Sequence, residues 1–256
     1  MKHRGVIPSL ACAGVIVATA TAYAAPVITT SSQTTVFPVS NTDLLQQSGV
    51  THVNRDNAGN TLTDTNALFT YNDGNNGNTA SLGVPALTNG QFGLAGRPQA
   101  EAEYAGVAGQ AVGTSGLPLN VTYALNIAAS PAGYNLTGID VYTGWADNGR
   151  DDINVSISYS TAAAPATFLP LTTVNFVPGV STTPIDNKAS VTDSSGLLAA
   201  GVANLRFEFP LQENSGVGYR EIDVFGTAVP EPASAGLLGL GALGLLARRR
   251  RADRTR

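Results

Sequence analysis

Short runs in which apolar and polar residues alternate recur along the second half of this chain. In residues 153–159 every second side chain is large and apolar, so an extended strand there has one apolar face and one face of small polar groups. Strand patterns of this kind occupy residues 121–127, 136–142, 153–159, 171–177, 205–209 and 222–225. Turn residues separate the runs, which is typical of a sandwich or barrel. The pattern therefore predicts an all-β body.

The last run and the first half of the body show weaker patterns. Ile222 and Val224 alternate with Glu221, Asp223 and Phe225. Residues 25–66 are rich in Thr, Ser, Asn and Asp, which predicts edge strands and long loops. Residues 43–47 are expected to form one helical turn, and residues 93–116 an irregular segment. No repeat or linker divides the body.

The N-terminal residues are typical of a cleaved export signal. A basic start is followed by the apolar residues 6–20, which are fewer than the roughly 20 residues that a membrane span needs. Ala22 and Ala24 then form a small-x-small site for signal peptidase. We expect a signal helix in residues 1–24, cleavage after Ala24, and a mature chain delivered by the export machinery.

The C-terminal end combines three features in order. Val229, Pro230, Glu231 and Pro232 come first, an apolar run at residues 233–247 follows, and the chain continues with Arg248, Arg249, Arg250 and Arg251. Prolines mark a helix start rather than a helix interior. Fifteen residues of helix rise ~22 Å, against a hydrocarbon core of about 30 Å. The run is thus a short transmembrane helix suited to a temporary hold, with residues 252–256 as a cytoplasmic tail.

These three features resemble the PEP-CTERM sorting signal over residues 229–251. The resemblance implies recognition by an exosortase-type membrane protease, followed by release or transfer to the cell surface. Such proteins are typical of Gram-negative bacteria that make exopolysaccharide. The alternative is an ordinary C-terminal membrane anchor. The expected location is transient anchoring in the inner membrane and then the cell surface or extracellular matrix.

Composition limits the function of the body, residues 25–228. It holds six basic and sixteen acidic side chains, a net charge of −10, which excludes nucleic acid as a partner. The single cysteine, Cys12, lies in the signal, so the mature body has neither a disulfide nor thiol chemistry. His52 is the one histidine of the body. A His/Cys zinc site is thereby excluded, and His52, which has no nucleophile motif near it, is expected on the surface.

Several segments of the body resemble the galactose-binding-like β-sandwich superfamily, which includes the discoidin or coagulation-factor type C domains. Residues 68–75 are similar to its "DGN" loop, residues 202–207 to its penultimate strand, and residues 219–226 to its final strand. Residues 136–142 and 153–160 lie where the family has its central hairpin. The resemblance covers most of residues 60–228 and implies a jelly-roll-like β-sandwich. The family's Trp after the DGN loop and its cysteine pair are both missing here.

Two loops carry candidate binding chemistry. Trp145, Asp147, Arg150 and Asp151 combine an aromatic ring, a guanidinium and carboxylates, which suits a sugar with an apolar face and a hydroxyl rim. Alternatively, Trp145 packs into the core and the rest is a solvated turn. Asp73 and Asn75 offer oxygen ligands for Ca²⁺, whereas the bland interpretation of their Asn- and Gly-rich loop is a tight turn. No other cofactor is expected.

The sequence gives no sign of an enzyme. Asp151 and Asp152 are adjacent, so on a regular strand they point to opposite faces and cannot act as a catalytic pair. The resulting hypothesis is a non-enzymatic, surface-displayed β-sandwich that binds carbohydrate, with extracellular polysaccharide as its partner. The alternatives are a structural or adhesive matrix protein without a small ligand, and a secreted glycan-processing enzyme that uses Asp or Glu.

Overall fold

A computed structural model gives the fold of this protein. It describes residues 25–55, 59–62, 64, 70–72, 78–80, 84–93, 105–107, 119–145, 150–179, 185–209 and 217–230. Within these ranges the chain forms thirteen β-strands and two short 3-10 helices, and no α-helix. The all-β prediction is therefore confirmed for the body.

The strands are short in the first half of the chain and long in the second half. The early elements are β1 (Val27–Gln33), η1 (Leu44–Gln46), β2 (Thr51–Arg55), β3 (Thr61–Leu62), β4 (Thr70–Asn72), β5 (Asn78–Ala80), η3 (Val84–Thr88) and β6 (Ala105–Val107). The later ones are β7 (Leu119–Ala124), β8 (Tyr134–Trp145), β9 (Ile153–Thr161), β10 (Ala164–Phe176), β11 (Ile185–Thr192), β12 (Ala199–Phe209) and β13 (Val217–Ala228). Each predicted strand of the second half is present, and the predicted helical turn is η1, capped by the Asp43 side chain.

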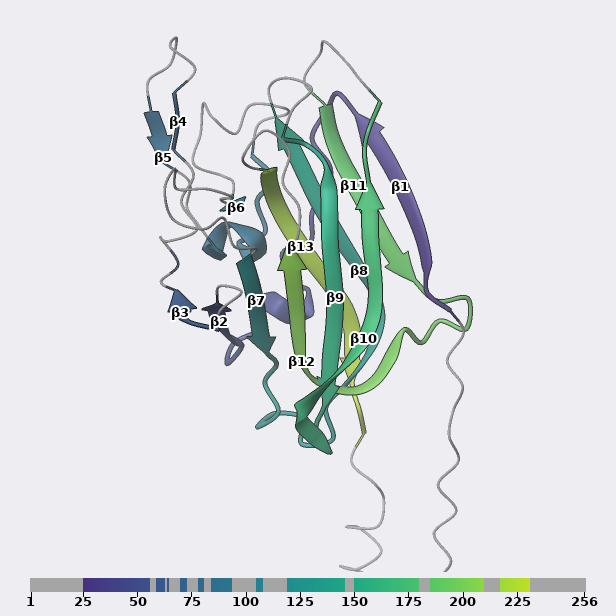
Figure 1. Cartoon of the computed structure of the whole chain (residues 1–256). Helices are drawn as coiled ribbons and strands as arrows, with labels where there is room; N and C mark the ends of the chain where they lie inside the picture. Colours follow the sequence, from purple (N-terminus) through teal and green to yellow (C-terminus); the bar gives the residue numbers. More distant parts are fainter. Residues whose placement is uncertain are drawn as a thin grey trace, which may run out of the picture.

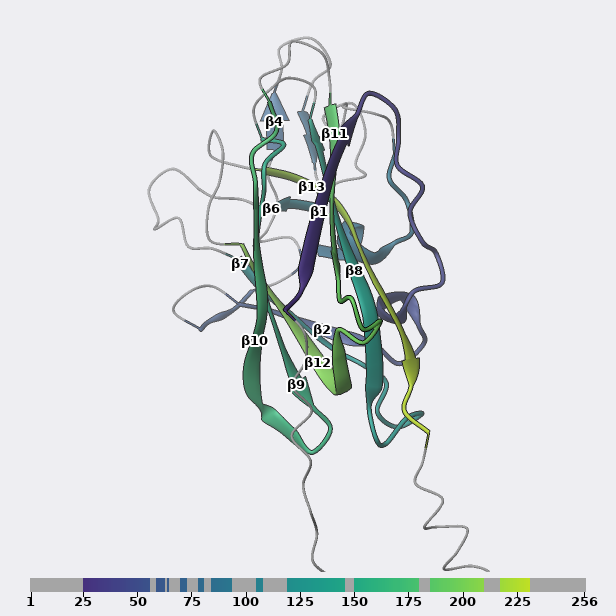
Figure 2. The same cartoon turned by 90° about the vertical axis from the view of Figure 1, so that its right-hand side faces the viewer.

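Eleven of the strands form one sheet that folds into two layers (Figures 1 and 2). One layer has the order β1-β11-β8-β13-β6, and the other β3-β2-β7-β12-β9-β10. The layers join where β12 pairs briefly with β8, at Ala199–Leu136 and Val202–Tyr134. Strands β4 and β5 form a separate hairpin. The layers thus build a β-sandwich.

The core lies between the two layers because alternating side chains from both point inward. The pattern predicted for residues 153–159 is confirmed, since Ile153, Val155, Ile157 and Tyr159 are all buried. Leu205, Phe207 and Phe209 are buried beside them in the same layer. The facing layer contributes the buried residues Ile139, Val141, Ile222 and Val224. A period of two in the sequence therefore becomes two inner faces in the fold.

Two short helices close one side of the sandwich. Both pack on β13, and they contribute Leu44, Leu45, Val84, Ala86 and Leu87 to the main core. A smaller cluster of Phe37, Phe92 and Tyr142 covers the outer face of β8. The polar first half of the chain thus supplies the apolar residues that seal the open side.

Strand β1 begins and β13 ends at the same end of the sandwich. A cross-strand row shows this, because Val27 lies opposite Thr192, Thr192 opposite Gly138, and Gly138 opposite Phe225 (Figure 1). We call this the tail end, since the chain leaves it at Val229 and Pro230. The far end is where β8 ends at Trp145.

The predicted signal helix and the predicted transmembrane helix lie outside the described residues. No helix in the described part of the chain is both long and apolar enough to cross a membrane.

Replacing Phe207 should destabilise the body strongly. This side chain is fully buried, and its ring meets the Tyr123 ring edge-on with centroids 6.0 Å apart. We expect Phe207→Ala to lower the free energy of unfolding by about 3–5 kcal/mol, measured by urea denaturation of residues 25–230. Leu169→Ala is the control, because Leu169 is exposed, and a change within about 0.5 kcal/mol is expected. Equal losses in the two variants would contradict the assignment of the core.

Candidate functional site

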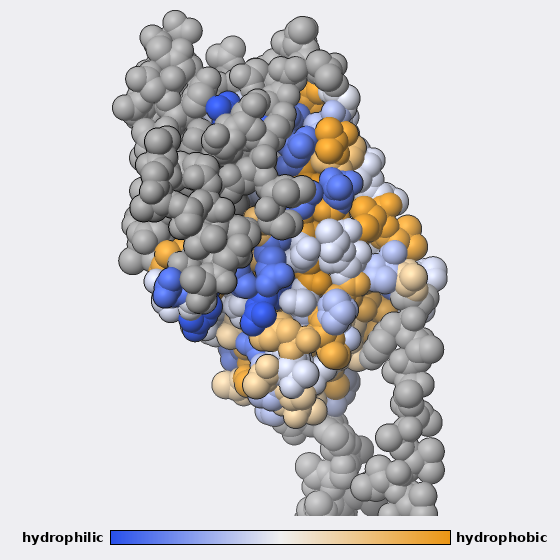
Figure 3. Space-filling model, viewed as in Figure 1, coloured by the Kyte–Doolittle hydropathy of each residue, from blue (hydrophilic) through white to orange (hydrophobic). Residues whose placement is uncertain are grey.

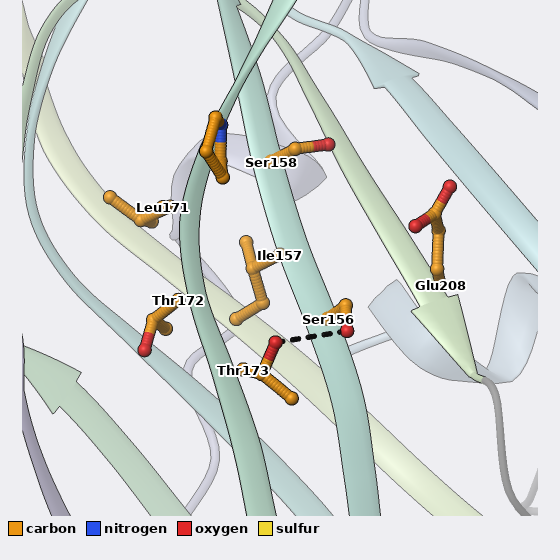
Figure 4. A pocket seen from close by; sticks show the side chains of 8 residues that line it. Ser156, Ile157, Ser158, Leu171, Thr172, Thr173 and Glu208 are labelled. Carbon is orange, nitrogen blue, oxygen red and sulfur yellow. Dashed lines mark hydrogen bonds between the residues drawn. The ribbon is translucent and has the colours of Figure 1, made fainter.

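The outer face of the six-stranded layer carries a shallow hollow between β9 and β10. Its volume is about 420 Å³, and it is lined by Ser156, Ile157, Ser158, Pro170, Leu171, Thr172, Thr173 and Glu208 (Figure 4). We call it the β9–β10 groove. Figure 3 shows the same face of the molecule, where hydrophilic and hydrophobic residues lie side by side.

The local sequence explains why the groove forms here. Strand β9 points Val155 and Ile157 into the core, which turns the small side chains of Ser156 and Ser158 outward. The register of β9 and β10 shifts between Pro170 and Thr172, so β10 is irregular next to these serines. Such irregularities redirect side chains and are common at functional edges of sheets.

Hydroxyl groups cross the groove from one strand to the other. Thr173 lies opposite Ser156, and their hydroxyl oxygens are 3.0 Å apart. Glu208 of β12 lies opposite Ser156 on the other side. Its Oε1 accepts a hydrogen bond from Asn120 Nδ2 at 3.1 Å. Two hydroxyls, a carboxylate and an amide therefore stand in one row across β10, β9, β12 and β7.

A stacked pair extends this polar face next to the groove. The Arg206 guanidinium lies over the Phe168 ring, 3.7 Å from its centroid. Arg206 Nε also donates to Thr122 Oγ1 at 3.3 Å, which fixes the plane of the guanidinium. Arg206 lies directly opposite Ser158, a groove residue, in the register of β12 with β9. The groove is thus flanked by a planar, charged platform.

Trp145, Arg150 and Asp151, three of the four residues predicted to bind a sugar, lie at the far end, and the Trp145 ring is buried. Trp145 is fully buried, and Arg150 Cζ lies 5.7 Å from its ring centroid. Asp151 is also buried, and its Oδ2 accepts from Asn187 Nδ2 at 3.0 Å. Asp147 lies outside the described residues. This arrangement matches the alternative prediction, in which Trp145 packs into the core. The ring has no exposed face on which a sugar can stack.

Arg150 has an unusual backbone. Its φ is 83°, in the left-handed region that residues other than glycine rarely adopt. Its carbonyl accepts a hydrogen bond from the Gly218 N–H at 2.7 Å, which ties the start of β9 to β13.

Asp73 and Asn75 lie outside the described residues, and among the residues that are described no three metal-ligating side chains gather. His52, expected on the surface, is partly buried, and its Nε2 lies 2.9 Å from Asp64 Oδ1.

The polar face of β13 differs most from a simple alternating strand. Arg220, Glu221 and Asp223 are buried, as fully as Ile222 and Val224 on the opposite face. Glu221 Oε2 accepts from the Gly90 N–H at 3.1 Å, and Asp223 Oδ2 accepts from the Ser40 N–H at 2.9 Å. Loops from the first half of the chain therefore cover this face. In the sequence, the three ionisable residues at positions 220, 221 and 223 were the signal that this face of the strand is polar and covered, and the sequence analysis did not use it.

Asp43 and Arg220 complete the same cluster. Asp43 Oδ1 accepts from the Leu45 N–H at 2.8 Å and from the Val224 N–H at 3.3 Å, so one oxygen caps η1 and binds the edge of β13. Arg220 Nε donates to the Phe92 carbonyl at 2.8 Å. Asp140, on the outer face of β8, pairs with Lys188 at 2.7 Å.

Burial changes the protonation of these carboxyl groups. Loss of solvent raises the pKa of Glu221 to about 9, and the carboxylates of Asp223 and Asp43 add to the effect. Burial likewise raises the pKa of Asp223 to about 6 and raises that of Asp43. Glu221 is therefore protonated at neutral pH, which limits the negative charge buried beside β13.

Comparisons with known proteins identify the C-terminal tail. Residues 228–251 match the PEP-CTERM protein-sorting motif, which confirms the predicted signal and marks the chain as an exported protein. None of the curated protein sequences matches the chain.

Solved structures similar to the body include carbohydrate-binding modules. The CBM32-2 module of a GH31 protein, bound to GalNAc, has 11% identity and a TM-score of 0.40, and the match covers 70% of this chain and 99% of that one. A CBM32-5 module from Clostridium perfringens, in complex with GalNAc-β-1,3-galactose, has 11% identity and a TM-score of 0.37, with coverage of 69% and 94%. An allantoicase has 13% identity and a TM-score of 0.40, with coverage of 75% and 45%.

The stability of the body should depend on pH through Glu221. Because its pKa rises from 4.5 to about 9 on folding, the folded state binds the additional proton between these values. The contribution of Glu221 to stability is therefore fully present below about pH 4.5 and is lost as the pH rises toward 9. We expect urea denaturation to show a loss of stability from pH 7 to pH 9.

A matched pair of variants isolates this effect. Glu221→Gln keeps a neutral acceptor for the Gly90 N–H and should flatten the dependence between pH 7 and pH 9. Glu208→Gln, on the outer face of β12, should keep the slope of the native chain. The same slope in Glu221→Gln as in the native chain would contradict the role of Glu221.

Proposed function

We propose that the body is a non-enzymatic carbohydrate-binding module that uses the β9–β10 groove. The observation that carries the proposal is the groove itself, in which serine and threonine hydroxyls lie beside Glu208 and next to the Arg206–Phe168 stack. A sugar presents hydroxyls at its rim and C–H groups on its faces. Carboxylate, amide and guanidinium groups bind the hydroxyls, while Pro170 and Leu171 contact the apolar faces.

The shape of the groove favours a polysaccharide chain over a small molecule. Sites for small molecules are enclosed and mostly apolar, and they bury most of the ligand. The β9–β10 groove instead lies on the outer face of a sheet, and polar side chains continue beyond it to Thr122 and Asn120 of β7. Several sugar units in a row could contact this strip. Because the body carries a net charge of −10, a neutral polysaccharide is favoured over a strongly anionic one.

The groove lacks the arrangement that a glycan-cleaving enzyme needs. Glycoside hydrolysis commonly uses two carboxyl groups that flank the scissile bond. Among the eight residues that line the groove, Glu208 alone carries a carboxylate. This favours binding without cleavage.

The sorting motif supports an encounter with extracellular polysaccharide. We propose that an exosortase-type protease recognises residues 229–232 after export and that the body then reaches the cell surface or matrix. The predicted short helix at residues 233–247 would hold the chain in the inner membrane until that step.

A thermal melt with ligands tests the binding proposal. Residues 25–230 would be melted alone, with Ca²⁺, and with neutral oligosaccharides and matrix polysaccharide. A ligand that binds the native state only stabilises it by ~2.7 kcal/mol at a hundredfold excess over its Kd. For a body of this size that is a rise in Tm of about 5–10 °C. We expect one glycan to give a saturable shift.

Variants locate the site and separate the alternatives. Arg206→Ala and Ser158→Leu should each raise the Kd for the glycan at least tenfold, and so reduce the shift in Tm. Arg206→Ala removes the guanidinium platform, and Ser158→Leu fills the groove. Ser194→Leu, at an exposed loop position away from the groove, is the matched control and should bind normally. If Arg150→Gly alone abolished the glycan-induced shift in Tm, the site would lie beside Trp145. A cooperative melt that no glycan shifts would leave a structural matrix protein, and product release would indicate an enzyme.

Replacing Pro230, Glu231 and Pro232 by alanine should block the final sorting step. The protease would lose the residues that it is proposed to read, so the tail would stay attached. We expect the triple variant to remain in the membrane fraction of the producing cell at its unprocessed size, detected by immunoblotting. Thr227→Ala, an exposed position just before the motif, is the control and should be processed normally. Processing of the triple variant at the native rate would contradict the proposal.

A further inference from the structure

Strand β1 is an open edge of the sandwich. It pairs with β11 along one side, and no strand in the described part of the chain pairs with its other side. All seven residues, Val27–Gln33, are in continuous register with β11, without a bulge. A strand of this kind presents a row of unpaired backbone N–H and C=O groups, which is a template for another strand.

The other edges are interrupted or short, whereas β1 is not. Strand β10 contains Pro165 and Pro170 and has two register shifts against β9. Strands β3 and β6 have two and three residues. Natural sheets block unwanted pairing with prolines, bulges, charges and short edges. Strand β1 has neither proline nor charge, so of the edges that the structure describes it is the one left able to pair.

The side chains of β1 leave room for a neighbour. None of the seven is buried, and six are exposed. Apart from backbone pairing, Ser32 anchors the strand, since its Oγ donates to Asn187 Oδ1 at 2.6 Å. The Lys188 ammonium, on the adjacent strand, is paired with Asp140. A second strand along this edge would therefore meet short, uncharged side chains on both faces.

We propose that β1 pairs with β1 of a second copy of this chain, antiparallel and centred on Thr30. The two five-stranded layers would then join into one continuous sheet across a two-fold axis. In this register Thr30 faces Thr30 of the other copy, Ile28 faces Ser32, and Val27 faces Gln33. No like charges meet, because the strand has none. Antiparallel pairs also have the more favourable hydrogen-bond geometry.

The orientation of the pair links assembly to release from the membrane. Strand β1 runs from the tail end toward the far end, so antiparallel pairing places the two tail ends at opposite ends of the dimer. Two copies held by their tails in one membrane cannot adopt this arrangement. The dimer therefore forms after the tail has been removed, or between copies on two facing surfaces. This step depends on the sorting motif but not on carbohydrate binding.

Cysteine cross-linking tests the pairing and its register. Directly opposite residues in antiparallel strands have Cα atoms about 4.5–5.5 Å apart, which a disulfide can span. The mature chain has no native cysteine, since Cys12 lies in the signal. Residues 25–230 with Thr30→Cys, oxidised with copper phenanthroline, should run as a covalent dimer in non-reducing gels. Val27→Cys, on the same strand, and Thr167→Cys, on the exposed edge strand β10, should remain at least tenfold less cross-linked.

A charge pair distinguishes pairing from misfolding. Thr30→Lys and Thr30→Asp should each be monomeric in analytical ultracentrifugation, because like charges would face one another across the axis. An equal mixture of the two should recover the dimer, which an unfolded variant could not do. The proposal is overturned if the native body stays monomeric at hundreds of micromolar, or if Thr30→Cys cross-links no faster than the two controls.

Discussion

Burial of the ionisable face of β13 holds the first half of the chain against the second. Glu221 and Asp223 accept the N–H groups of Gly90 and Ser40, and Asp43 accepts that of Val224. These bonds attach the loops at residues 40–45 and 90–92 to the strand. Those loops carry η1 and the aromatic residues that cover the sheet. A buried carboxylate without such donors would be costly. The polar contacts are therefore specific, and the apolar packing around them depends on their being made.

The β9–β10 groove, where we propose that carbohydrate binds, lies away from this closure. The closure is at β13, η1 and η3, whereas the groove is formed by β9, β10 and β12 on the outer side of the other layer. The inner faces of those strands are packed in the core, so their outer faces are free to carry Ser, Thr, Glu and Arg without loss of packing. A rigid sheet can thus present hydroxyls and charges at fixed spacing, as a binding surface requires.

The second half of the fold was predictable because its strands alternate strictly. Residues 153–159 and 205–209 show this pattern, and their apolar members form the core. Burial of Glu221 and Asp223 was not predictable, because the loops that cover them come from residues more than 100 positions earlier. For the same reason the sequence left two interpretations of Trp145 open, a ligand-binding ring and a core residue, and the fold buries it. The groove depends on which residues of β10 and β12 lie beside Ser156, and that register is invisible in one strand alone.

Strand order also determines when the β-sandwich can finish folding. The central strand β8 pairs with β11 on one side and with β13 on the other. Strand β1 cannot pair until β11, about 160 residues later in the chain, is present. Contacts between distant segments make folding slow. A chain that crosses a membrane from its N-terminus delivers β13 last, directly before the sorting motif. The sandwich consequently closes only when β13 has been delivered, at the point where the sorting motif follows in the chain.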